Sequence, residues 1–69
     1  MPTIADRLIE LQKERNLQKK DIAEAAGLSL MGYYRYEKGQ REPTASTIVK
    51  LCDFLGVSAD YLLGRTDTP

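Results

Sequence analysis

The hydrophobic residues of this chain recur three and four positions apart, which is the spacing of one face of an α-helix. Two such stripes consist of Ile4, Leu8 and Leu11, and of Ile48, Leu51, Cys52 and Leu55. No segment of the sequence shows the strict alternation of apolar and polar residues that is typical of a half-buried strand. The pattern therefore predicts an all-α fold.

Residues that begin and end helices divide the chain into five predicted helices. Ser and Thr side chains accept hydrogen bonds from the free N–H groups at helix starts, and glycine adopts the left-handed conformation that ends many helices. The predicted caps and stops are Thr3, Ser29, Thr44 and Ser58, and Asn16, Gly27, Gly39, Gly56 and Gly64. With these flanking residues, the predicted helices occupy 3–15, 18–26, 29–38, 44–56 and 58–64. We expect one five-helix domain over 1–69, with its core at 4–64 and a loose tail at 65–69.

A tight turn at Gly27, Leu28 and Ser29 joins two short predicted helices, and the whole unit spans 18–38. Ala23 lies four residues before the turn glycine, and its small side chain lets the two helices cross closely. Two helices joined in this way form a helix-turn-helix, whose second helix enters the major groove of DNA. The segment therefore indicates nucleic-acid binding.

The helix that follows Ser29 has two different sides. At about 100° per residue, Tyr33 and Tyr36 share one side, which we expect to face the core. The side that we expect to face outward carries Leu30, Met31, Tyr34 and Arg35. The guanidinium of Arg35 has the shape to form two hydrogen bonds with the edge of a guanine.

Four runs of residues follow one another in order along the chain. They are DIAE at 21–24, GLS at 27–29, RYEKG at 35–39 with REP at 41–43, and LGVSADYLLG at 55–64. Through these runs, residues 4–64 resemble the Cro and phage-repressor (xenobiotic-response-element) family of helix-turn-helix proteins. The resemblance implies a DNA-binding transcriptional regulator whose recognition helix begins after Ser29.

The resemblance also implies roles for individual residues. The implied base-reading residues are Leu30, Met31, Tyr34 and Arg35, and the implied phosphate contacts are Gln18, Lys19, Lys38, Gln40 and Arg41. Lys20 joins the phosphate contacts because the start of the second helix offers free N–H groups and the positive end of the helix dipole. Because one such domain reads a single half-site, we expect a homodimeric repressor on a palindromic operator in double-stranded DNA.

The sequence departs from the family pattern in three places. Lys19 replaces a glutamine, so it keeps the attraction to a phosphate but loses a fixed geometry. Gln12 replaces an arginine that pairs with the equivalent of Glu37, so a neutral hydrogen bond between Gln12 and Glu37 is expected. Leu30 and Met31 replace polar residues, so they can contact thymine methyl groups but cannot form hydrogen bonds with base edges.

The last predicted helix carries Tyr61, Leu62 and Leu63 within one turn. This is more apolar surface than a short terminal helix can bury beneath itself. We therefore expect these three residues to contribute to the dimer contact.

Composition bears on the class of protein. The ten basic and ten acidic residues cancel, although residues 13–41 hold seven basic against four acidic residues. The chain has no His, its single cysteine, Cys52, has no base partner, and no glycine loop or metal-ligand cluster occurs. We expect no enzyme activity, cofactor or metal, and a buried Cys52. One cysteine and no membrane span or signal peptide predict a cytoplasmic protein.

Two functions remain open at this point. The first is sequence-specific operator binding that represses transcription. The second is a protein-interaction module of the same fold, an antirepressor or antitoxin component, that grips a partner through Leu30, Met31 and Tyr34, since exposed Met and aromatic side chains also suit protein interfaces. Salt dependence separates the two, because phosphate contacts release counterions. The chain is either a complete Cro-like regulator or the DNA-binding part of a longer repressor.

Overall fold

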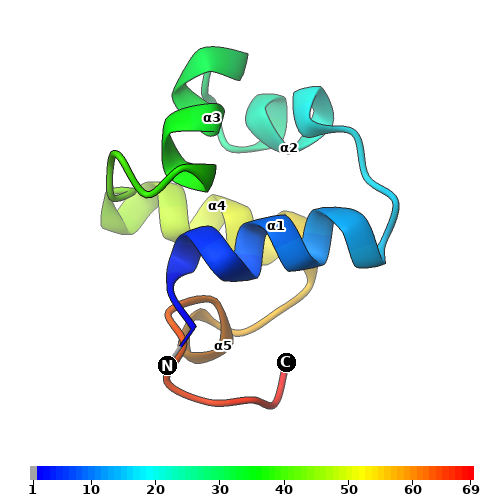
Figure 1. Ribbon diagram of the computed structural model, residues 1–69, viewed down its shortest axis with the longest axis vertical. Coiled ribbons are helices and arrows are strands. Elements are labelled where there is room, and N and C mark those ends of the chain that lie inside the picture. Colours follow the sequence, from blue (N-terminus) through cyan, green and yellow to red (C-terminus); the bar gives the residue numbers. More distant parts are fainter. Residues whose placement is uncertain (1) are drawn as a thin grey trace.

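The computed structural model describes residues 2–69, and this part of the chain forms five helices and no strand (Figure 1). The helices are α1 (Ile4–Glu14), α2 (Lys19–Ala25), α3 (Leu30–Glu37), α4 (Ala45–Leu55) and α5 (Ala59–Leu62). Each helix lies inside the segment that its cap and stop residues predict. The predicted all-α, five-helix fold is confirmed.

Local hydrogen bonds fix where the helices begin. At the start of α1, Thr3 Oγ1 accepts a hydrogen bond from the Asp6 N–H at 3.2 Å, and the Asp6 carboxylate accepts one from the Thr3 N–H at 3.1 Å. The hydroxyl groups of Ser29, Thr44 and Ser58 accept the corresponding hydrogen bond at the starts of α3, α4 and α5. The predicted caps are therefore confirmed.

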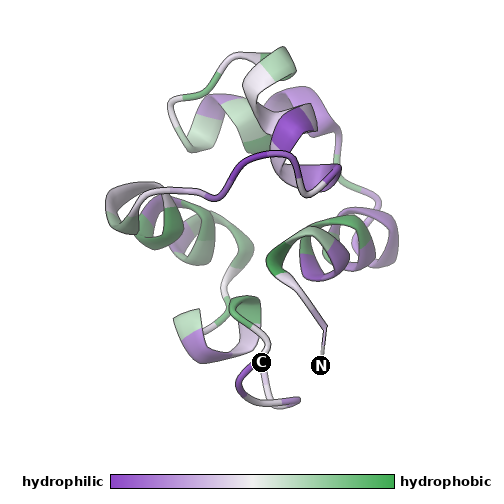
Figure 2. Cartoon of the chain, turned by 60° about the vertical axis from the view of Figure 1, so that its left-hand side comes forward, coloured by the Kyte–Doolittle hydropathy of each residue, from purple (hydrophilic) through white to green (hydrophobic). Residues whose placement is uncertain are grey.

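The helices surround one core and hold α3 at one end of the molecule. In Figure 1, α2 and α3 lie at this end, α5 lies at the other end with both chain ends, and α1 and α4 lie between. α1 packs against both α3 and α5, and α4 packs against both α2 and α5. The segment that connects α3 to α4 is strongly hydrophilic (Figure 2). No helix within residues 2–69 has the length and hydrophobicity needed to cross a membrane.

Residues 65–69 do not form the loose tail that we expected. Arg7 Nη2 donates a hydrogen bond to the Thr66 carbonyl oxygen at 3.2 Å and another to Asp67 Oδ1 at 3.0 Å. These contacts join the first helix to residues about sixty positions further along the chain. The tail is therefore docked on the domain, because it supplies acceptors to a buried cation.

The surroundings of Arg7 show why the C-terminal residues stay close to α1. Arg7 is only 5% exposed, and its guanidinium lies 4.0 Å from the ring centre of Tyr61. Tyr61 in turn donates a hydrogen bond from its hydroxyl to Glu10 at 3.3 Å. Gly64 follows with a φ of 80°, and a Cβ at this position would overlap the carbonyl oxygen of Pro2. The N-terminal and C-terminal segments thus meet closely beside α5.

The expected dimer contact requires a correction. Tyr61 and Leu62 are buried in the core of the single chain, while Leu63 is 38% exposed. The short α5 does bury most of its apolar surface, because α1 and α4 both pack against it. Of the three predicted contact residues, Leu63 alone is exposed.

Candidate nucleic-acid interface

The turn between α2 and α3 has the geometry of a helix-turn-helix. Gly27 adopts a φ of 70°, a left-handed conformation that glycine tolerates without steric cost. The Leu28 N–H donates a hydrogen bond to the Ala23 carbonyl oxygen at 2.8 Å, which closes the end of α2. Ala23 and Ala26 are buried in the core, and α2 packs against α3. The sequence predicts that the small side chain of Ala23 lets these two helices cross closely, and the burial of Ala23 agrees with this.

The two sides of α3 divide as predicted. Tyr33 and Tyr36 are buried in the core. On the opposite side, Leu30 is 41% exposed and Met31 is 62% exposed. The other two predicted base-reading residues, Tyr34 and Arg35, are half-buried and exposed, respectively. α3 therefore presents a continuous outward side that mixes apolar groups with one cation.

Exposed basic and amide side chains lie at the start of α2 and directly after α3. The predicted phosphate contacts that are exposed are Gln18, Lys20, Lys38, Gln40 and Arg41. Among residues 2–69, none of the cations Lys20, Arg35, Lys38 and Arg41 takes part in an ion pair. Their charges are therefore free to attract an anion from solution.

The start of α2 offers unpaired backbone donors. Gln18 occupies the N-cap position but makes no side-chain capping hydrogen bond. The N–H groups of Lys19 and Lys20 have no acceptor within residues 2–69. Free N–H groups at a helix start can bind a phosphate. The structure thus provides the donors that the sequence predicts at this position.

Lys19 differs from the other predicted phosphate contacts because it already has a partner. Its Nζ lies 2.9 Å from Glu37 Oε1, and the side chains of Lys19 and Glu37 are 40% and 7% exposed. The hydrogen bond with Glu37 raises the pKa of the Lys19 ammonium. The same ammonium lies 5.3 Å from the centre of the Tyr34 ring. Lys19 therefore joins α2 to two residues of α3.

The expected hydrogen bond between Gln12 and Glu37 does not form. Gln12 Nε2 instead donates to the Leu17 carbonyl oxygen at 2.7 Å, within the connection between α1 and α2. Lys19 reaches Glu37 in its place. The ion pair that supports Glu37 thus comes from α2, which corrects the prediction of a neutral hydrogen bond from α1.

Two polar atoms beside this pair are buried without a partner among residues 2–69. They are Glu37 Oε2 and the hydroxyl oxygen of Tyr33. Burial, with the negative charge of Glu37 as a smaller cause, raises the pKa of Tyr33 above its ordinary value of 10.0. The buried side of α3 therefore carries a carboxylate and a phenol, and one cation from α2 lies beside them.

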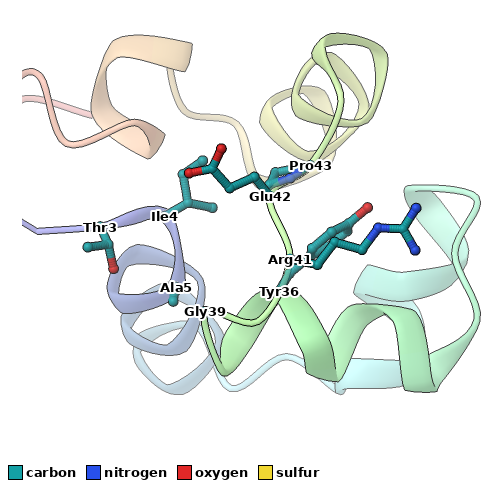
Figure 3. A pocket seen from close by; sticks show the side chains of 8 residues that line it. All are labelled: Thr3, Ile4, Ala5, Tyr36, Gly39, Arg41, Glu42 and Pro43. Carbon is teal, nitrogen blue, oxygen red and sulfur yellow. The ribbon is translucent and has the colours of Figure 1, made fainter.

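A shallow pocket lies beside this surface rather than on it. It has a volume of about 190 Å³ and lies between the start of α1 and the segment after α3 (Figure 3). Its lining residues are Thr3, Ile4, Ala5, Tyr36, Gly39, Arg41, Glu42 and Pro43. In Figure 3 the Arg41 side chain extends past Tyr36, away from Ile4 and Glu42. Within residues 2–69 no cluster of three metal-ligating side chains occurs.

A family model described as Helix-turn-helix matches residues 8–62. The chain belongs to this helix-turn-helix family. One relative of this helix-turn-helix protein is the cryptic phage CTXphi transcriptional repressor RstR of Vibrio cholerae, 38% identical over 94% of the chain and 58% of RstR. Another is the SPbeta prophage-derived HTH-type transcriptional regulator YonR of Bacillus subtilis, 36% identical over 88% of the chain and 56% of YonR. The chain thus spans little more than half the length of these relatives.

Solved structures give the same fold. The P22 c2 repressor in complex with a synthetic operator superposes with a TM-score of 0.84 at 22% identity, over 91% of this chain and 96% of the repressor chain. The restriction-modification controller protein C.AhdI of Aeromonas hydrophila superposes with a TM-score of 0.79 at 28% identity, over 87% of this chain and 91% of its own. The resemblance to the Cro and phage-repressor family is confirmed, and the relatives are named as regulators rather than enzymes.

Sequence reasoning missed two clusters of this helix-turn-helix protein. The first is the ion pair of Lys19 with Glu37, and the second is Arg7 with its acceptors near the end of the chain. Neither is visible in the helical periodicity, because each joins residues far apart in sequence. Arg7 did carry one signal, since it lies beside Leu8 and Leu11 on the buried side of α1.

Proposed function

We propose that the chain is the DNA-binding domain of a transcriptional regulator that recognises a specific operator in double-stranded DNA. The observation that carries this proposal is the outward side of α3, which is exposed and flanked by unpaired cations. A helix presented in this way fits the major groove, where base edges differ between sequences. A repressor occupying promoter DNA is the regulator that agrees best with the relatives, and it acts in the cytoplasm.

In this proposal, Arg35 and the apolar residues on the same side of α3 contact different groups of the bases. The exposed guanidinium of Arg35 donates two hydrogen bonds to one guanine edge. Leu30 and Met31 contact thymine methyl groups, because apolar side chains match the one apolar group of the major groove. Tyr34 contributes its half-exposed ring at the same side of α3.

Phosphate contacts supply most of the affinity in this proposal. The side chains that supply them are Gln18, Lys20, Lys38, Gln40 and Arg41, and the free N–H groups at the start of α2 bind a further phosphate oxygen. These contacts release counterions, so binding weakens steeply as salt is added.

We further propose that two copies bind a palindromic operator, because one domain reads a single half-site. Leu63 is the exposed apolar residue that remains beside α5 for a contact between copies. Sedimentation of the protein at micromolar concentration, with and without the selected operator, tests this part. A monomer in both samples contradicts it.

The experiment that tests the function is selection from a randomised duplex pool by fluorescence anisotropy and sequencing, at two salt concentrations. Enrichment of a palindromic motif with steep salt dependence supports an operator-binding regulator. Absence of binding at low salt contradicts the proposal.

The exposure of Leu30 and Met31 also favours a second candidate, a module that binds a protein partner through α3. An interface built on these two residues and Tyr34 is largely apolar. Binding of such a partner is insensitive to salt, in contrast to DNA binding. An antirepressor or an antitoxin complex is the kind of assembly that this candidate implies.

A further inference from the structure

Lys19 is held between two side chains of α3 by its charge. Its ammonium forms the ion pair with Glu37 at 2.9 Å, and Glu37 is almost fully buried. A buried carboxylate that loses its only cation is strongly unfavourable. Glu37 also occupies the last turn of α3, where the helix dipole repels a negative charge. Lys19 is therefore poorly placed to leave Glu37 for a DNA phosphate.

Tyr34 is the second partner of the Lys19 ammonium. The distance of 5.3 Å from Nζ to the ring centre lies within the range of a cation–π interaction. The ring belongs to the outward side of α3 and lies partly against the core. Its orientation decides which atoms α3 presents to a base step, so a fixed cation on the ring restricts that choice.

We propose that Lys19 is a positioning residue, which orients Tyr34 on the reading side of α3 and does not itself neutralise a DNA phosphate. Glu37 fixes the ammonium, and the ammonium fixes the ring. This inference rests on the proposed DNA-binding function and deepens it, because it assigns a role in specificity to a residue at the edge of the interface.

The inference separates two quantities, the salt dependence of DNA binding and the discrimination between operator and random DNA. The ion pair of Lys19 and Glu37 is neutral, so it releases no counterion from DNA. Replacing both residues by glutamine keeps the net charge of the protein unchanged. The double variant Lys19→Gln/Glu37→Gln should therefore keep the wild-type salt dependence while losing discrimination between operator and random DNA.

The experiment titrates operator and random duplexes with wild type and the double variant at several salt concentrations. We expect the double variant to keep the wild-type slope of log affinity against log salt. We expect the ratio of operator to random affinity to fall about twofold to fivefold, the size of an exposed cation–π interaction. A slope that flattens by about 0.9, the value of one phosphate contact, overturns the inference.

Lys20→Gln is the matched control. Lys20 is the neighbouring lysine of α2, is exposed, and has no ion pair within residues 2–69. Its replacement should flatten the slope by about 0.9 on both duplexes and leave their affinity ratio unchanged. The control thus shows how the loss of a true phosphate contact looks in the same assay.

Two further variants test whether Lys19 acts through Tyr34. In a Tyr34→Leu background, the double glutamine variant should cost no further discrimination, and an additional loss contradicts the inference. Lys19→Arg, with Glu37 unchanged, keeps a cation between Glu37 and the Tyr34 ring. It should therefore show the wild-type ratio of operator to random affinity, in contrast to the double variant. Failure of this rescue also contradicts the inference.

A measurement on the free protein makes the inference independent of the DNA-binding proposal. Scalar couplings about χ1 of Tyr34 should indicate one rotamer in wild type and averaging between rotamers in the double variant. If the double variant does not fold, Lys19→Gln alone serves for the same measurement. Unchanged couplings overturn the inference, whereas a wild-type protein that selects no operator overturns the proposed function alone.

Discussion

Arg35 and Arg65 are both exposed arginines, but Arg35 belongs to α3 and Arg65 follows α5, and these two helices lie toward opposite ends of the molecule (Figure 1). We expect Arg35→Ala to weaken operator binding by about 1–3 kcal/mol, because a bidentate contact with guanine is lost. Arg65, which lies after α5 and forms an exposed ion pair with Asp60 at 3.4 Å, is the control, and Arg65→Ala should bind normally. Anisotropy titrations on operator and random duplexes measure both variants. Equal losses on the two duplexes for Arg35→Ala contradict its role in base reading.

Tyr33 gives the molecule a sensitivity to alkaline pH. Its hydroxyl is buried without a partner among residues 2–69, and its pKa is raised, chiefly by burial. The folded state therefore keeps a proton on this phenol that the unfolded state loses above pH 10.0, the ordinary pKa. Stability should be unaffected below this pH and should fall as the pH rises above it.

Tyr33→Phe tests this dependence. The variant removes an unsatisfied buried hydroxyl, so at neutral pH its free energy of unfolding should be within about 1 kcal/mol of wild type or higher. Above pH 10.0, wild type should lose up to about 1.4 kcal/mol per pH unit that the variant keeps. Urea unfolding from neutral pH to pH 11 or so provides the measurement. Parallel curves for the two proteins contradict the prediction.

At the scale of the helices, the crossing of α2 and α3 depends on a small side chain at Ala23. Ala23→Leu inserts a large group into a packed contact and should lower the free energy of unfolding by about 1–3 kcal/mol. Ala25 lies on the exposed side of the same helix, so Ala25→Leu should change stability by no more than about 0.5 kcal/mol. Urea unfolding measures both variants. Equal effects at Ala23 and Ala25 contradict a tight crossing.

The elements could be predicted from the sequence because the signals that begin and end them are local. Thr3 and Ser29, for example, bond to N–H groups only three residues away. The candidate site could be predicted only in part. The exposure of Leu30 and Met31 follows from helical periodicity, whereas the pairing of Lys19 with Glu37 depends on how α2 and α3 pack.

Apolar surface at the last helix shows a second limit of sequence reasoning. Tyr61, Leu62 and Leu63 are all hydrophobic, and a periodicity cannot distinguish a residue in the core from one in a contact between copies. The distinction depends on the space that α1 and α4 leave beside α5. Only the tertiary structure shows that the first two residues are buried.

For the molecule as a whole, the docked tail links the last residues of the chain to α1. Removal of residues 66–69 deletes the acceptors of Arg7 and the hydrogen bond from the Ser58 N–H to the Pro69 carbonyl oxygen at 3.1 Å. The melting temperature should fall by about 4–8 °C, which corresponds to a loss of about 1 kcal/mol of stability in a domain of this size. Calorimetry measures this shift, and an unchanged melting temperature contradicts it.

Asp67→Asn serves as the control for the truncation. The Asp67 side chain is 98% exposed, so its ion pair with Arg7 is largely screened by water. The asparagine retains an acceptor for Arg7 and all backbone contacts of the tail. We expect a melting temperature close to wild type. A large decrease shows that the charge, rather than the docked backbone, holds the tail.

The meeting of both chain ends beside α5, with α3 at the far end, makes the domain suitable for tethering (Figure 1). A dye or a carrier protein attached at either end leaves the outward side of α3 uncovered. Two copies in tandem, joined by a flexible linker, would each keep this side free. The linker would raise the effective concentration of the second copy at a palindrome, so one polypeptide could occupy both half-sites without depending on self-association.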